Sequence, residues 1–287
     1  MVNDGLVDHQ AEDPAGVPVD AAGTGGHGSN EERRGRVPDA GEVITTRKGA
    51  VAVITVSSPE VRNGLSPEMG GQLVAACDAV DADPAVGAVV VRGAGGTFCS
   101  GADTRRWDGM GDPASDEAYD VISAVYDAFV RVGTLGVPTI AAVRGAAVGA
   151  GLNLMLATDL QVVAEDARLI AGFVRIGIHP GGGFFTLAGR MGGRRAAAAL
   201  GLFGEEVSGR RAVELGLAWE AVPDDHVEDR ALELATRAAG DPLLARRAVA
   251  SFRTELGPPS VSWPAALAME RGVQMWSQRR WHGAGEG

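Results

Sequence analysis

The chain has 287 residues, 45% of them hydrophobic and 22% charged, with a formal net charge of −11 at pH 7. The hydrophobic fraction suffices for a globular core, and the acidic excess argues against nucleic acid or an anionic membrane as a partner, because phosphate would be repelled. No apolar run reaches the length of a membrane span and no signal peptide is recognisable, so we expect a cytoplasmic protein. Cys77 and Cys99 have no partner at metal-ligand spacing, so we expect neither a metal site nor a disulfide framework.

Residues 1–42 differ in composition from the rest of the chain. They contain eight glycines, three prolines and no aromatic residue, and nine acidic side chains stand against three arginines. Such a segment buries too little apolar surface to offset the entropy lost on ordering. We therefore predict a disordered acidic tail. A partner-binding role for it is an alternative that no specific motif in the segment supports.

From residue 43 onward the apolar residues follow strand and helix spacing. Alternation around Arg47–Gly49 predicts a hairpin over 42–58, and Ser66 followed by Pro67 marks the start of a helix over 66–83. Apolar runs predict buried strands at 86–93, 137–147, 159–166 and 167–173. Helical spacing predicts a helix over 116–135 and a helix interrupted by glycines over 184–204. The segment 208–223 begins as a helix and ends as a strand, and the rest of the chain after it is predicted to be helical. Alternating strands and helices predict an α/β fold with buried parallel strands.

The stretch GAAVGAGLNLMLATD (145–159) joins a strand to a helix through a glycine-rich turn. Backbone N–H groups at the start of a helix favour negative charge, and small residues let a ligand approach them, so this turn predicts an anion site or an oxyanion hole. Tight packing of the strand on the helix is the alternative explanation. The G-x-G-x-x-G pattern of dinucleotide-binding proteins is not met, because Leu154 occupies the position of its last glycine. Nucleotide binding is therefore the weakest hypothesis.

A second glycine-rich turn, SGAD (100–103), also follows a buried strand. Two such turns could direct two N–H groups at one carbonyl oxygen and stabilise an enolate. With these turns, the motifs FCSGAD (98–103), RGAAVGAGLNLMLATDLQVVAEDARL (144–169), IGIHPGGG (176–183) and SGRRAVELGLAWEAVP (208–223) resemble the crotonase, or enoyl-CoA hydratase/isomerase, superfamily. The similarity extends over roughly residues 43–257.

The resemblance implies a crotonase-like spiral of ββα units with a helical C-terminal arm. It assigns residues 43–224 to the core domain and 225–287 to a helical region that covers CoA and makes trimer contacts. The expected assembly is a homotrimer or homohexamer. The expected ligand is an acyl-CoA thioester, and no separate cofactor is expected because coenzyme A is part of the substrate.

The resemblance also implies roles for individual residues. The backbone N–H groups of Ala102 and Ala150 would polarise the thioester carbonyl. The residues expected to contact the substrate are Arg62, Gly64, Ser100, Gly101, Asp103, Gly149 and Phe173.

The catalytic carboxylates of typical hydratases are replaced in this chain. Asn153 and Phe173 stand where those enzymes carry two glutamates, and neither side chain takes up a proton. Asn153 could hold a water molecule, and His179 is the remaining candidate for proton transfer. Two hypotheses follow, an acyl-CoA enzyme with weak hydratase activity and an unassigned acid/base, or a non-catalytic acyl-CoA-binding protein.

Overall fold

The computed structural model describes residues 41–106, 111–112, 114–256 and 262–283. The predicted tail lies outside the described residues except for Gly41 and Glu42, and Glu42 already belongs to the first strand. Within the residues described, no helix combines the length and the apolar composition needed to cross a bilayer.

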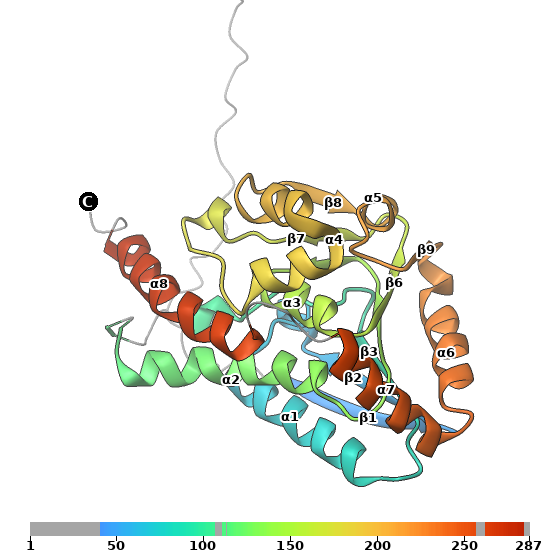
Figure 1. The fold of residues 1–287 in the computed structure, drawn as a ribbon. Coiled ribbons are helices and arrows are strands. Elements are labelled where there is room, and N and C mark those ends of the chain that lie inside the picture. The colour runs from blue at the N-terminus through green and yellow to red at the C-terminus, as the bar shows by residue number, and fades with distance from the viewer. Residues whose placement is uncertain (1–40, 107–110, 113, 257–261, 284–287) are drawn as a thin grey trace, which may run out of the picture. The chain divides into compact units, whose positions relative to one another are not determined.

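A six-stranded sheet forms the centre of the fold (Figure 1). The antiparallel hairpin of β1 and β2 stands at one edge, and every later strand is parallel to its neighbour. The inner strands are runs of Val, Ile and Ala buried on both faces, as expected for parallel strands. In sheet order the strands are β1 (Glu42–Lys48), β2 (Val51–Ser57), β3 (Ala88–Gly93), β4 (Thr139–Val143), β6 (Leu160–Ala164) and β9 (Glu220–Val222).

A second, three-stranded sheet consists of β5 (Ala146–Val148), β7 (Arg168–Ile170) and β8 (Glu206–Ser208). The single strand predicted over 137–147 is therefore wrong, because the chain leaves the large sheet after β4 and joins the small one as β5. The break falls at Gly145, whose φ is +59° and where an added Cβ would lie 2.4 Å from the Gly96 carbonyl oxygen. Only glycine fits that turn. The short strand β8 was not predicted.

Eight helices surround the sheets in the described part of the chain. Ser66 and Ser115 cap the first two helices by accepting hydrogen bonds from Met69 N and Ala118 N, which explains their sharp starts. The helices are α1 (Pro67–Ala82), α2 (Asp116–Gly133), α3 (Ala150–Ala157), α4 (Phe184–Gly201), α5 (Gly209–Glu214), α6 (Val227–Ala238), α7 (Pro242–Leu256) and α8 (Trp263–Gly283). Single 3-10 turns are η1 (Pro59–Val61), η2 (Thr104–Arg106), η3 (Val174–Ile176) and η4 (Asp224–His226).

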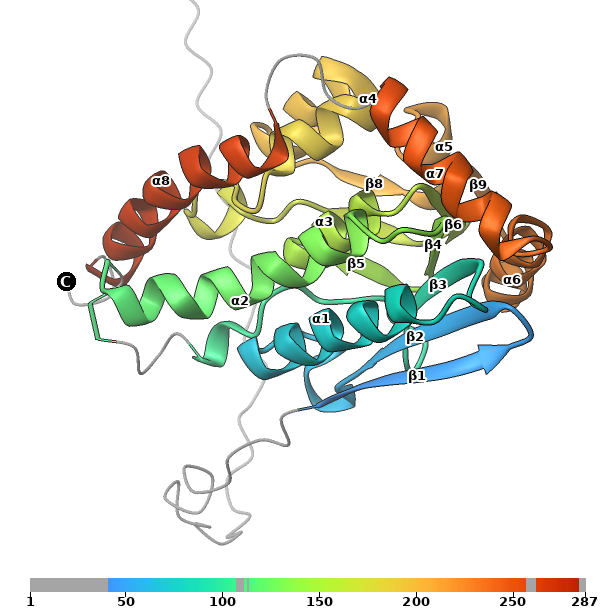
Figure 2. The same cartoon turned by 60° about the horizontal axis from the view of Figure 1, so that its bottom comes forward.

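The helices α2, α3 and α8 position the candidate site. In both views α1 and α2 lie side by side, and α8 crosses α2 obliquely (Figures 1 and 2). The ring of Trp263 stacks on Phe129 with centroids 6.1 Å apart, and the Arg271 guanidinium lies 4.3 Å from the ring centre of Tyr119. These contacts fix α8 antiparallel to α2. The predicted α/β fold with a helical C-terminal region is confirmed, whereas a role of that region in assembly stays a prediction.

Candidate functional site

The two glycine-rich turns singled out in the sequence lie against each other. Gly101 has a φ of +106°, and a Cβ added there would lie 3.0 Å from the Val148 carbonyl oxygen and 3.8 Å from Ala150 N. A side chain at this position would therefore both strain the backbone and separate the turns. The contact brings the SGAD turn to the N-terminus of α3.

The N–H groups of Ala102 and Ala150 are left without protein acceptors in the described part of the chain. Leu65 N donates to Gly101 O (2.7 Å), and Asp103 N donates to Leu65 O (2.9 Å). In extended backbone the peptide groups alternate in direction, so the N–H of Ala102 points away from Leu65. Ala150 is the first residue of α3 and has no acceptor one turn earlier in the helix. Neither N–H group is therefore used for a hydrogen bond within the described part of the protein.

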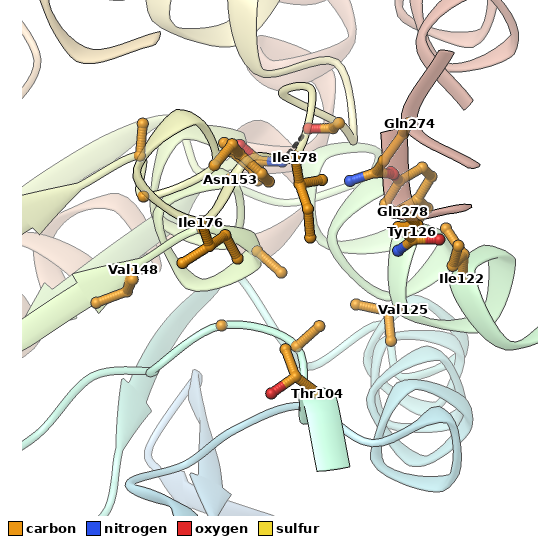
Figure 3. Close-up of a pocket in the computed structure, with 18 of the residues that line it drawn as sticks. Thr104, Ile122, Val125, Tyr126, Val148, Asn153, Ile176, Ile178, Gln274 and Gln278 are labelled. Atoms are coloured by element: carbon orange, nitrogen blue, oxygen red, sulfur yellow. Dashed lines mark hydrogen bonds between the residues drawn. The ribbon is translucent and has the colours of Figure 1, made fainter. Parts of the chain in front are cut away.

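Both alanines line a cavity of about 180 Å³ that is mostly apolar (Figure 3). Its walls come from the SGAD turn, α2, the start of α3, the segment around η3, and α8. The apolar lining residues with large side chains are Val121, Ile122, Val125, Val148, Phe173, Ile176 and Ile178. An acyl or aryl chain could be buried against these side chains with its carbonyl oxygen near the two backbone donors.

Asn153 lies in the first turns of α3 and faces the same cavity. Its Nδ2 donates to the carbonyl oxygen of Gly181 (2.9 Å), while its Oδ1 has no partner among the described residues. The residue is 1% exposed, and the oxygen itself is buried. The amide is therefore held in place in the cavity wall by its hydrogen bond to Gly181.

Three further polar side chains reach the cavity from α2 and α8, namely Tyr126, Gln274 and Gln278. A Cβ added at Gly181 would lie 2.2 Å from both Gln274 Nε2 and the Tyr126 hydroxyl, so these groups touch the same glycine. Burial raises the pKa of Tyr126 above its ordinary value, and the nearby charge of Glu270 adds to the effect. The phenol therefore stays protonated at neutral pH and is a hydrogen-bond donor.

Comparison with known proteins identifies the family. The model of the enoyl-CoA hydratase/isomerase family matches residues 46–275. This chain belongs to that family. The probable enoyl-CoA hydratase EchA14 of Mycobacterium tuberculosis is 46% identical over 193 residues, which are 67% of this chain and 73% of that protein. The resemblance inferred from the four motifs is thus confirmed.

Other family members agree with the assignment. The 1,2-epoxyphenylacetyl-CoA isomerase of Escherichia coli is 34% identical over 70% of this chain and 77% of its own length. Among solved structures, an enoyl-CoA hydratase/isomerase from Xanthobacter autotrophicus matches with a TM-score of 0.76 and 30% identity. The match covers 83% of this chain and 87% of that one.

The residues predicted to contact the ligand divide into two groups. Ser100, Gly101, Gly149 and Phe173 line the cavity together with Ala102, Ala150 and Asn153. Phe173 contributes only its ring, which packs on Phe184 with centroids 5.9 Å apart.

The other four predicted residues are not among those that line the cavity. Arg62 and Gly64 lie next to Ser100, whose N–H donates to the Arg62 carbonyl (3.0 Å). Asp103 pairs with Arg105 at 2.8 Å. The Nδ1 of His179 is 2.7 Å from the Pro180 carbonyl oxygen, and its ring meets the edge of Phe185. Their proposed roles in this family member stay predictions.

A half-buried carboxylate on α8, that of Glu270, was missed entirely. Gly183 N donates to Glu270 Oε2 (2.6 Å) at the start of α4. Burial raises the pKa of Glu270 to about 7, and hydrogen bonds from Gly183 and Phe184 oppose the shift. With Gln274 and Gln278, Glu270 forms a polar stripe at intervals of four residues. That spacing was visible in the sequence, but it does not say what the stripe contacts.

Proposed function

We propose that this protein is an enzyme acting on acyl-CoA thioesters, with the backbone N–H groups of Ala102 and Ala150 as an oxyanion hole. One observation carries the proposal: two N–H groups without acceptors among the described residues belong to alanines that line one mostly apolar cavity. Removing one such donor typically costs about 10²–10³-fold in rate. Relatives that are named as an epoxyphenylacetyl-CoA isomerase and as an enoyl-CoA hydratase support the substrate class.

The chemistry follows from where charge develops. When water adds to the third carbon of an enoyl thioester, negative charge moves onto the thioester oxygen, and a proton then returns to the second carbon. Two backbone donors and the positive end of α3 would stabilise that enolate oxygen. The apolar walls exclude bulk water, which strengthens both interactions. In an isomerisation the intermediate would be a dienolate, formed by removal of one proton and consumed by its return at another carbon, and the same two donors would stabilise its oxygen.

This chain differs from a standard hydratase in the residues that would transfer protons during catalysis. Asn153 and Phe173 replace the two expected glutamates, and none of the described cavity-lining residues carries a carboxylate or an imidazole. General acid/base catalysis contributes about 10²–10⁴-fold. We therefore expect hydration to be slow, with Asn153 holding the water. This observation also favours the second candidate function, a non-catalytic acyl-CoA-binding protein.

Turnover and binding separate the two functions. Hydration of crotonyl-CoA and hexenoyl-CoA would be followed by the loss of enoyl-thioester absorbance, and affinity would be measured by titration calorimetry. Turnover supports the enzyme, binding without turnover supports the binding protein, and absence of both contradicts the proposal. His179→Ala tests the remaining proton-transfer candidate, since a catalytic histidine would lower turnover without changing affinity.

The homotrimer or homohexamer expected from the family is part of the same proposal. Exposed apolar side chains in the described structure, such as Phe203 and Trp219, are consistent with contacts between copies. Light scattering at micromolar concentration should give three or six times the 29.4 kDa of one chain. A monomeric mass would contradict it.

A further inference from the structure

The segment Gly181–Gly183, which we call the glycine turn, lies between the cavity and the start of α4. Its first residue lines the cavity, and its second and third residues have φ of +71° and +76°. Glycine adopts such angles without strain, but it loses more backbone entropy on ordering than any other residue. The turn also offers no side chain to cap α4, whereas serines cap α1 and α2. Its order therefore depends on contacts from elsewhere in the chain.

Each residue of the glycine turn is tied by a side chain from another element. The first carbonyl oxygen accepts from Asn153 Nδ2 (2.9 Å), and the second accepts from Trp263 Nε1 (3.3 Å). The last N–H donates to Glu270 Oε2 (2.6 Å), and this carboxyl also accepts a hydrogen bond from the Phe184 N–H. In the close-up, Asn153 lies on one side of the turn and Gln274 on the other (Figure 3). Two of the three ties come from α8.

The side chains of α8 that meet the glycine turn share one face of the helix. Trp263, Glu270 and Gln274 follow one another at intervals of seven and four residues, which places them on the same side. A Cβ added at Gly181 would lie 2.2 Å from Gln274 Nε2, and one added at Gly183 would lie 2.5 Å from Trp263 Nε1. Polar groups are needed on this face because the turn presents backbone N–H and C=O groups that require partners.

The glycine turn connects α8 to the wall of the cavity. Its bond to Asn153 fixes that amide in the wall, and both Asn153 and Gly181 line the cavity. On the other side of the turn, Phe184 packs its ring on Phe173, which also lines the cavity, with centroids 5.9 Å apart. Glu270 itself is half-buried and is not among the lining residues. The segment that it caps, however, holds residues that are.

We infer that Glu270 is a positioning residue for the acyl group: by capping α4 from α8, and with Trp263 as a second tie, it keeps the glycine turn and the adjoining cavity wall in the shape that receives the acyl chain. The inference rests on the proposed binding of acyl-CoA. A wall that is already ordered requires no ordering when the ligand binds. A wall that is ordered only part of the time lowers the apparent affinity in proportion to that fraction.

The gain in affinity from a longer acyl chain tests the inference. We would measure the Kd of acetyl-CoA and of hexanoyl-CoA by titration calorimetry and take their ratio as the acyl gain. Glu270→Met keeps an unbranched side chain of similar size but accepts no hydrogen bond from the turn, so the acyl gain should fall about 5- to 10-fold. Glu270→Gln keeps an acceptor oxygen and should retain the gain. The Kd of acetyl-CoA should be nearly equal in all three proteins, because its acyl group is too short to fill the cavity.

A control and a second variant separate positioning from a general loss of stability. Arg279→Gln breaks the exposed ion pair of α8 with Asp112 (2.9 Å) and leaves the glycine turn untouched, so the acyl gain should not change. Trp263→Phe removes the other tie from α8 and keeps a ring to stack on α2, so it should also lower the acyl gain. If Glu270→Met does not fold, Trp263→Phe decides, because an unchanged gain would show that the turn needs no tie from α8.

The remaining outcomes are distinct. An acyl gain in Glu270→Met equal to that of the parent protein would overturn the inference and leave acyl-CoA binding standing, even if the melting temperature fell. Equal losses in Glu270→Met and Glu270→Gln would also overturn it, because the acceptor oxygen would then have no part in the effect. An equal loss in Arg279→Gln would attribute the effect to weaker docking of α8 and would count against the inference. Failure of the parent protein to bind any acyl-CoA would overturn the proposed function, and the inference with it.

Discussion

The half-buried carboxyl of Glu270 predicts how stability changes with pH. Its pKa is raised from an ordinary 4.5 to about 7, first by burial, while N–H groups at the start of α4 oppose the shift. The folded state therefore binds this proton more tightly than the unfolded chain. The stabilisation is fully present below about pH 4.5 and is lost as the pH rises through 7. A shift of this size corresponds to at most about 3 kcal/mol.

Glu270→Gln removes the charge and keeps an acceptor for Gly183 N. The variant should be more stable than the parent protein at pH 8 by up to about 3 kcal/mol, and the difference should disappear towards pH 5. Urea unfolding at half-unit steps from pH 5 to 8 measures both curves. Glu117→Gln, an exposed glutamate on α2, is the matched control and should leave the pH dependence unchanged. Parallel curves for the parent protein and Glu270→Gln would refute the reasoning.

Three other predictions follow from the same structure. Ala102→Pro and Ala150→Pro each remove a backbone donor and should lower turnover by about 10²–10³-fold, checked by steady-state kinetics with circular dichroism to exclude misfolding. Unchanged rates in both variants would remove the oxyanion-hole assignment. Asn153→Glu combined with Phe173→Glu should raise the hydration rate of crotonyl-CoA, whereas a further decrease would show that the replaced glutamates are misplaced. Deleting residues 1–40 should leave the melting temperature and the assembly unchanged, and a fall of many degrees would show that this segment packs on the core.

Local chemistry made much of the fold predictable. The start of α1 followed from Ser66 and Pro67, and buried strands followed from Val- and Ile-rich runs. The division of one predicted strand at Gly145 was not predictable, because the two halves are equally apolar and the break depends on contact with Gly96. The three-residue strand β8 lacks a periodic pattern long enough to detect.

The candidate site was predictable only where its residues follow one another in the chain. The turns that carry Ala102 and Ala150 have recognisable glycine patterns, and the structure places both beside one cavity. Gln274 and Gln278 are more than 120 residues further on, and their position depends on how α8 returns to α2. No local sequence pattern specifies that α8 packs against α2. This packing is fixed by tertiary contacts such as the stacking of Trp263 on Phe129.

We propose that this cavity polarises a thioester carbonyl through two backbone N–H groups. The infrared difference spectrum of a saturated acyl-CoA labelled with ¹³C at its carbonyl, recorded free and bound, reports on that bond. Two hydrogen bonds to the oxygen weaken the C=O bond, so we expect a lower stretching frequency on binding, with the shift reduced in Ala102→Pro and in Ala150→Pro. An unshifted carbonyl band in a bound acyl-CoA would contradict it.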